Sequence, residues 1–231
     1  MGKVFSKGSA KACLKDQSAT GALPAISAGQ GQGLSLPVEE LEVVRAKARV
    51  LVKQGWERAY HMQFEEARAR FEEASTLDPG MAAALYGLAY VLCRHNKRVE
   101  EGEAAFQHAL QMDPDRGSTD PSALHTLGIL QEAKNNMEGA EVAYRRAIEL
   151  QPQVSAYHKD LGSVLIGKSH MDAGINSWRR ALELNAADVA LLKNLGEVFR
   201  NQGDLDSAIA AYRRLLELQP DDHTTHCNLG V

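Results

Sequence analysis

Three residues spaced 34 apart carry side chains suited to binding a peptide: Asp160, Asn194 and Asn228. Residues at a constant spacing occupy equivalent places in successive units of a repeating fold, so these three are expected to lie in a line. An asparagine side chain offers a donor and an acceptor together, which matches the two polar groups of a peptide backbone. We expect this line to contact extended peptides, beside three basic residues that make the surface locally positive: Lys159, Lys193 and Arg200.

Four aromatic residues in the N-terminal half form a second candidate binding surface: Trp56, Tyr60, Tyr86 and Tyr90. Aromatic side chains in a groove commonly anchor a partner protein. The alternative is that a helix beginning near Pro37 folds over them. The sequence leaves both interpretations open.

The first residues of the chain match the N-myristoylation pattern, in which glycine stands second and serine or threonine sixth. Gly2 and Ser6 occupy these positions. One acyl chain binds a membrane weakly, so we expect a second signal, either from nearby lysines or from palmitoylation of Cys13. Two alternatives remain. The glycine stands there by chance, or the Ser-rich, acid-poor segment is an organelle transit peptide.

Metal-binding and catalytic patterns are weak. His223, His226 and Cys227 are close enough on a helix to share an ion, but a structural zinc site needs four ligands and the sequence offers no fourth. The sequence contains no Gly-rich phosphate loop, no zincin helix and no nucleophile elbow. We therefore expect no metal, no cofactor and no enzymatic activity.

The charge is unevenly distributed. Residues 1–36 carry a net charge of +3 and the rest of the chain −7, and an acidic body argues against nucleic-acid binding. Cys13, Cys93 and Cys227 are far apart and show no disulfide-framework spacing, which fits a reducing compartment. The longest uncharged, mostly apolar stretch, Met81–Cys93, is shorter than the about 20 residues that cross a bilayer.

The elements that must position these residues are visible as a repeat. A small residue lies four positions before each of five aromatic residues, and alanine usually lies three positions after and proline usually eight positions after. Small residues let two helices approach closely, and proline cannot continue a helix, so the pattern predicts helical hairpins repeating about every 34 residues. The aromatic residues are Phe71, Phe106, Tyr144, Trp178 and Tyr212.

This pattern resembles the tetratricopeptide repeat, and the resemblance covers residues 48–231. It implies an all-α fold, a right-handed superhelical solenoid of antiparallel helix pairs with about five and a half repeats. Residues 1–36 are expected to be a disordered basic tail and residues 37–47 a leading helix that continues into the first repeat. We place the five repeats at 48–81, 82–116, 121–154, 155–188 and 189–222, and an incomplete sixth repeat or cap at 223–231.

The resemblance implies a non-catalytic scaffold or adaptor that takes a peptide segment or a helix of another protein in its concave groove. The line of asparagines resembles that of the repeat region of the O-linked N-acetylglucosamine transferase, which grips extended peptides. Two alternatives remain: the N-terminal region of a larger enzyme such as a glycosyltransferase, which the interrupted sixth repeat favours, or a structural assembly subunit.

We expect a cytoplasmic protein, held at the cytoplasmic face of a membrane if Gly2 is acylated. A transit peptide would instead place the protein in an organelle. The sequence leaves open the identity of the partner and the oligomeric state.

Overall fold

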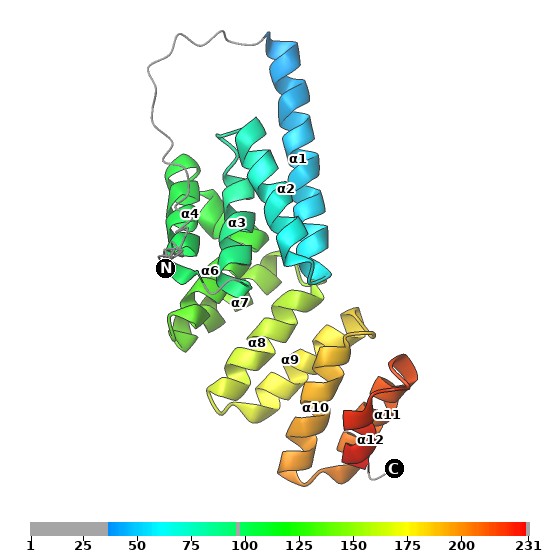
Figure 1. Ribbon diagram of the computed structural model, residues 1–231. Coiled ribbons are helices and arrows are strands. Elements are labelled where there is room, and N and C mark those ends of the chain that lie inside the picture. The colour runs from blue at the N-terminus through cyan, green and yellow to red at the C-terminus, as the bar shows by residue number, and fades with distance from the viewer. Residues whose placement is uncertain (1–36, 96–97, 230–231) are drawn as a thin grey trace, which may run out of the picture. The chain divides into compact units, whose positions relative to one another are not determined.

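The computed structural model describes residues 37–95 and 98–229 (Figure 1). Within these ranges the chain forms twelve helices and no strand, which confirms the predicted all-α solenoid of helix pairs. The helices are α1 (Val38–Tyr60), α2 (Phe64–Leu77), α3 (Ala82–Arg94), α4 (Val99–Met112), α5 (Arg116–Thr119), α6 (Pro121–Ala133), α7 (Met137–Leu150), α8 (Ser155–Gly167), α9 (Met171–Leu184), α10 (Val189–Gln202), α11 (Leu205–Leu218) and α12 (His223–Leu229).

Five hairpins account for most of these helices. The pairs are α1 with α2, α3 with α4, α6 with α7, α8 with α9, and α10 with α11, and the members of each pair pack on one another. We call the earlier helix of each pair the first helix and the later one the second helix.

In four of the five hairpins, the turn reverses direction through a single residue with a left-handed backbone. This residue is Met62, Asn135, Ser169 or Gly203, with φ of 62°, 60°, 66° and 80° respectively. Glycine adopts this conformation freely and asparagine tolerates it, whereas methionine and serine are strained there. The geometry that recurs in these four turns therefore outweighs the local backbone preference of the methionine and the serine.

The large aromatic residue of a second helix lies on the small residue of its own first helix. A Cβ atom added at Gly128 would lie 2.3 Å from the ring of Tyr144, and one at Gly196 would lie 2.3 Å from the ring of Tyr212. Since real Cβ contacts are much longer, only glycine fits at these two places. The small residues predicted from the sequence are therefore needed for two reasons. They leave room for the aromatic ring of the second helix, and they let the two helices approach closely.

The buried apolar residues form separate clusters that extend over several helices. One cluster of buried residues runs from α1 to α8, and a second runs from α9 to α11 and includes Trp178 and Tyr212. The short α12 packs against the second cluster through Leu229, and its Thr225 is buried. A helix of seven residues is marginal alone, so these contacts stabilise it.

The segment that begins at Pro37 does not fold back over the aromatic residues. It forms the start of α1, which continues without a break to Tyr60. Glu39 and Glu40 lie in its first turn, where acidic side chains interact favourably with the helix dipole. Trp56 and Tyr60 therefore belong to the same helix as the leading segment, which does not cover them, whereas Trp56 of this helix packs against Tyr90.

Candidate functional site

The first helices of the second, third and fourth hairpins meet in a buried ionic network. Asp160 on α8 is only 3 % exposed. Its Oδ1 accepts a hydrogen bond from Nη2 of Arg94 on α3 at 2.6 Å, and its Oδ2 lies 2.8 Å from Nε2 of His125 on α6. Arg94 and Asp160 belong to hairpins that are two apart, so this network joins three successive hairpins.

Burial and charge together determine the protonation of this network. Burial alone would raise the pKa of Asp160, but the charge of Arg94 and the hydrogen bond from His125 outweigh it and lower the pKa. Burial lowers the pKa of His125 more strongly than Asp160 raises it. Asp160 is therefore ionised and His125 neutral at pH 7, with the Nε2–H of His125 donated to the carboxylate. The Nδ1 atom of His125 has no hydrogen-bond partner among the described residues.

Aromatic rings surround the network. The His125 ring lies 4.7 Å from the Tyr157 ring, 5.5 Å from the Tyr90 ring and 5.6 Å from the Tyr144 ring, measured between centroids. The Tyr144 hydroxyl donates a hydrogen bond to Glu132 at 3.0 Å. These rings exclude water from His125, which is the physical reason for its lowered pKa.

Three of the predicted peptide contacts lie in the interior. Tyr86 is 1 % exposed, Tyr90 is 4 % exposed, and Asp160 belongs to the buried network. Tyr86 packs edge-on against Phe106, with ring centroids 5.1 Å apart. The expectation that these three side chains line an open groove is corrected: they pack the inside of the helix array.

The other two predicted aromatic residues remain accessible to solvent. Tyr60 is 43 % exposed, and Trp56 is partly buried against Phe71 and Tyr90. The Trp56 and Tyr60 rings stack with centroids 6.0 Å apart. Together they form an aromatic surface at the end of α1, as anchors for a partner would require.

The predicted polar residues of the C-terminal hairpins lie on or near the surface. Asn194 on α10 is exposed, and its side chain makes no hydrogen bond to any described residue; Lys193 is partly exposed. Arg200 donates a hydrogen bond to Oδ1 of Asn228 at 3.1 Å, which links α10 to α12. Lys159 forms an ion pair with Asp188, with 2.9 Å between its Nζ atom and Oδ2 of the carboxylate. We name Lys193, Asn194, Arg200 and Asn228 the α10–α12 polar surface.

The sequence interpretation missed Arg94 because it lies at the end of an apolar helix, five positions after the small residue Ala89. A charged residue at the end of an apolar helix was the feature of the sequence that could have indicated a buried ion pair. No spacing rule pairs it with Asp160, 66 residues later, since the pairing depends on how three hairpins stack. The predicted line of side chains is therefore divided, with Asp160 buried and Asn194 exposed.

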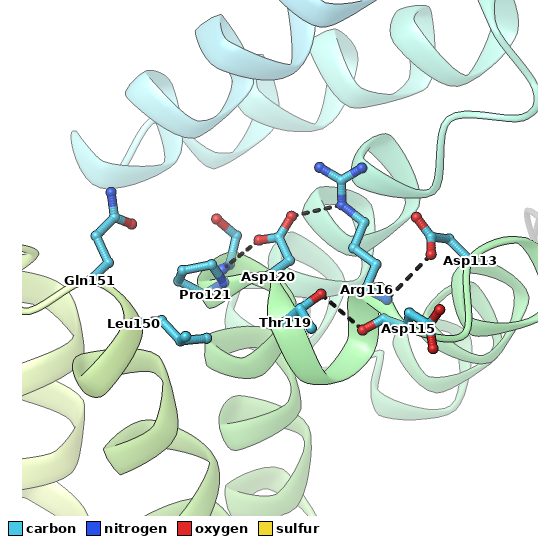
Figure 2. A pocket seen from close by; sticks show the side chains of 9 residues that line it. Asp113, Asp115, Arg116, Thr119, Asp120, Pro121, Leu150 and Gln151 are labelled. Carbon is cyan, nitrogen blue, oxygen red and sulfur yellow. Dashed lines mark hydrogen bonds and ion pairs between the residues drawn. The ribbon is translucent and has the colours of Figure 1, made fainter.

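A cavity of about 630 Å³ lies at the connection between α4 and α6 (Figure 2). Arg116 pairs there with Asp120 through its Nε at 2.7 Å. The Asp120 carboxylate also accepts a hydrogen bond from the Ser122 backbone N–H at 2.8 Å and so caps α6. The full lining is Asp113, Asp115, Arg116, Thr119, Asp120, Pro121, Ser122, Leu150 and Gln151.

The predicted lipidation positions, Gly2 and Cys13, lie outside the described residues. Within the described ranges, no three His, Cys, Asp or Glu side chains are grouped so that they could hold a metal ion. None of the helices in these ranges has the length and apolar character needed to cross a membrane.

Three solved structures with a similar fold are distant from this chain in sequence. YrrB, described as a TPR protein with an unusual peptide-binding site, is 18 % identical with a TM-score of 0.52, and the match covers 84 % of this chain and 97 % of that one. PilF of Pseudomonas aeruginosa is 18 % identical with a TM-score of 0.58, and the match covers 78 % of this chain and 78 % of that one. TTC0263 of Thermus thermophilus is 20 % identical with a TM-score of 0.59, and the match covers 78 % of this chain and 96 % of that one. These likenesses concern the fold alone.

Family models give the more direct assignment. No curated protein matches the sequence. One model described as tetratricopeptide repeat matches residues 52–117 and 159–223, and another with the same description matches residues 121–154. These matches extend over more than half of the chain, and each of the five helical hairpins overlaps a matched range. The chain belongs to the tetratricopeptide-repeat family.

Proposed function

We propose that this protein is a non-catalytic scaffold that binds peptide segments of other proteins on the α10–α12 polar surface. The observation that carries the proposal is the exposure of Asn194, whose amide has no partner among the described residues although it lies on a first helix. A scaffold function agrees with the family, and the similar protein YrrB is described as having a peptide-binding site.

The chemistry of this surface suits a peptide backbone. The Asn194 amide can donate to a backbone carbonyl and accept from a backbone N–H at the same time. Arg200 is exposed and holds Asn228 at 3.1 Å, so a guanidinium and an amide are presented next to one another. Lys193 adds a second positive charge on α10, which favours peptides that carry acidic residues or a free carboxylate.

Trp56 and Tyr60 supply a second contact in this proposal. Stacked aromatic rings give a large apolar area with little loss of side-chain freedom, and such residues often dominate binding energy. The buried network of Arg94, His125 and Asp160 is not a ligand contact in this account. Its role is to hold three hairpins in a defined arrangement.

We also propose that Gly2 is acylated and, with a second signal from the lysines or from Cys13, holds the protein at the cytoplasmic face of a membrane. The support is the pattern of Gly2 and Ser6 and the net charge of +3 over residues 1–36.

A photo-crosslinking experiment tests the peptide-binding proposal. A benzophenone amino acid replaces Asn194 in the full-length chain, and the chain is irradiated in a lysate. We expect a discrete crosslinked partner. The same amino acid at Asn176, an exposed asparagine on second helix α9, is the matched control and should give no such product. Equal crosslinking from both positions would show that the α10 position has no special role.

A further inference from the structure

One side of α1 carries an apolar stripe that is exposed. Val43 is 69 % exposed and Val50 is 54 % exposed, and Ala46 between them is exposed as well. Spacings of three and four residues place these side chains on the same side of the helix. No described helix covers this side of α1, since all three residues remain accessible to solvent. We name Val43, Ala46 and Val50 the α1 stripe.

The α1 stripe includes a position that is buried everywhere else in the repeat. Val50 lies five residues before the small residue Gly55. The residues at the same place in the later first helices and in α12 are all 0 % exposed: Ala84, Ala123, Tyr157, Leu191 and Thr225. This position packs on the preceding hairpin, as Ala84 does in a cluster with Ala74 of α2. Val50 is therefore an apolar residue at a packing position with no described neighbour across it.

Another hairpin of the same kind does not fit on this side of α1. The later first helices have leucine one position before the small residue and valine or leucine two positions after it. In α1 these two positions hold Gln54 and Glu57, both exposed. A covering hairpin would bury their polar groups, which is costly without hydrogen-bond partners. The apolar surface of α1 is therefore a narrow stripe, which suits a single helix packed along it.

Charged residues flank the α1 stripe in a self-complementary order. Glu39 and Glu42 lie toward the N-terminal end of α1, Arg49 and Lys53 lie closer to its C-terminal end, and all four are exposed. Glu39 and Arg49 form no ion pair with any described residue, and Glu42 and Lys53 pair only with neighbours on the same helix. One end of the stripe is thus acidic and the other basic. A matching electrostatic partner for this surface is the same surface turned end for end.

We propose that the α1 stripe joins two copies of this chain in an antiparallel contact with two-fold symmetry. With Ala46 at the axis, Val43 of each copy lies against Val50 of the other. The small side chain of Ala46 lets the two helices approach closely at the centre. The α1 stripe shares no residue with the α10–α12 polar surface, so this proposal and the proposed peptide binding can fail independently.

The same register pairs the flanking charges. Glu42 of each copy faces Arg49 of the other, and Glu39 faces Lys53, so that each pair occurs twice. A parallel arrangement would instead place each of these residues near its own equivalent, and like charges would repel. Lys47 lies at the edge of the contact, where its long side chain reaches solvent. The order of the charges therefore selects the antiparallel arrangement.

Analytical ultracentrifugation of the unacylated full-length chain tests the proposal. A concentration series should show a reversible monomer–dimer equilibrium with a dissociation constant in the micromolar range, because the stripe is small compared with the interfaces of stable dimers. Val43→Asp should weaken dimerisation about tenfold or more, because it places a charge in the apolar centre of the contact. Val142→Asp is the matched control, since Val142 on α7 is also 69 % exposed, and it should dimerise like the wild type.

Charge exchange tests the antiparallel register. Glu42→Arg and Arg49→Glu should each prevent dimerisation, because each variant places like charges opposite one another. An equimolar mixture of the two variants should form a heterodimer, because opposite charges then meet at both contacts. Two single variants that dimerise like the wild type, or a mixture that stays monomeric, would overturn the proposal. A wild type that is monomeric at every concentration would also overturn it and leave the α1 stripe to a different protein or to residues 1–36.

Discussion

Asp160 stabilises the fold, although its spacing in the sequence suggested that it binds a peptide. Its position, 34 residues before Asn194, predicted a surface contact, yet Arg94 and His125 hold it in the interior. Removing one partner of a buried ion pair is costly because the other charge remains desolvated.

We expect Asp160→Asn to lower the free energy of unfolding by about 3 kcal/mol, the lower end for such pairs because Arg94 is partly exposed. Chemical denaturation measures this. Asp172→Asn, on the exposed face of α9, is the control and should change stability by less than about 0.5 kcal/mol. Similar values for both variants would mean that the network does not stabilise the fold.

His125 should make stability depend on pH. Because its pKa in the folded chain is below the usual 6.5, its contribution is fully present above pH 6.5 and is lost as the pH falls from 6.5 toward the folded value. Asp160, also with a lowered pKa, adds its own loss below its usual 3.8. Arg94, Lys159 and Asp160 are the charged groups that act on His125.

His125→Asn should therefore flatten the pH dependence of unfolding between pH 7 and 5. The wild type should lose up to about 1.4 kcal/mol per pH unit there, and urea unfolding at several pH values measures the difference. The variant is less stable at pH 7, so the slope is compared rather than the absolute value. Parallel slopes in both proteins would show that His125 does not titrate in this range.

At the scale of the elements, the contact between a second-helix ring and a first-helix glycine decides how closely each hairpin packs. Gly128→Val should destabilise the protein by about 1 to 3 kcal/mol, because its side chain would overlap the Tyr144 ring. Gly167→Ala is the control, since nothing lies within 4 Å of an added Cβ there. Thermal unfolding compares the two, and equal melting temperatures would refute this view of the hairpin.

Much of the helical arrangement was predictable because it is periodic. A glycine or alanine recurs on the first helices at nearly constant spacing, and an aromatic residue such as Tyr144 or Tyr212 recurs on the second helices. Each such pair repeats the same local packing. The helix α5 was not predicted, since four residues inserted between hairpins follow no period. The Arg94–Asp160 pair was not predicted either, because it depends on the stacking of hairpins that are two apart. For the same reason, spacing did not distinguish buried Asp160 from exposed Asn194.

At the scale of the whole molecule, the chain is an array of tetratricopeptide repeats, each a helical hairpin. The proposed attachment of this array to a membrane depends on Gly2. We expect Gly2→Ala to move the protein from the membrane fraction to the soluble fraction, because the acyl chain requires an N-terminal glycine. Cell fractionation with mass spectrometry of the N-terminal peptide measures both properties. Ser18→Ala, in the same segment but outside the pattern, is the control. An unacylated wild type in the soluble fraction would contradict the proposed tether.

The central claim is that the α10–α12 polar surface binds a segment of another protein. The most direct test is the dissociation constant of the partner segment crosslinked at Asn194, measured for the wild type, for Asn194→Ala combined with Asn228→Ala, and for Asn176→Ala. The account predicts binding about tenfold weaker in the double variant, a loss of about 1.4 kcal/mol, with a nearly unchanged melting temperature, and wild-type affinity in the Asn176 variant. Equal affinity in all three proteins would contradict it.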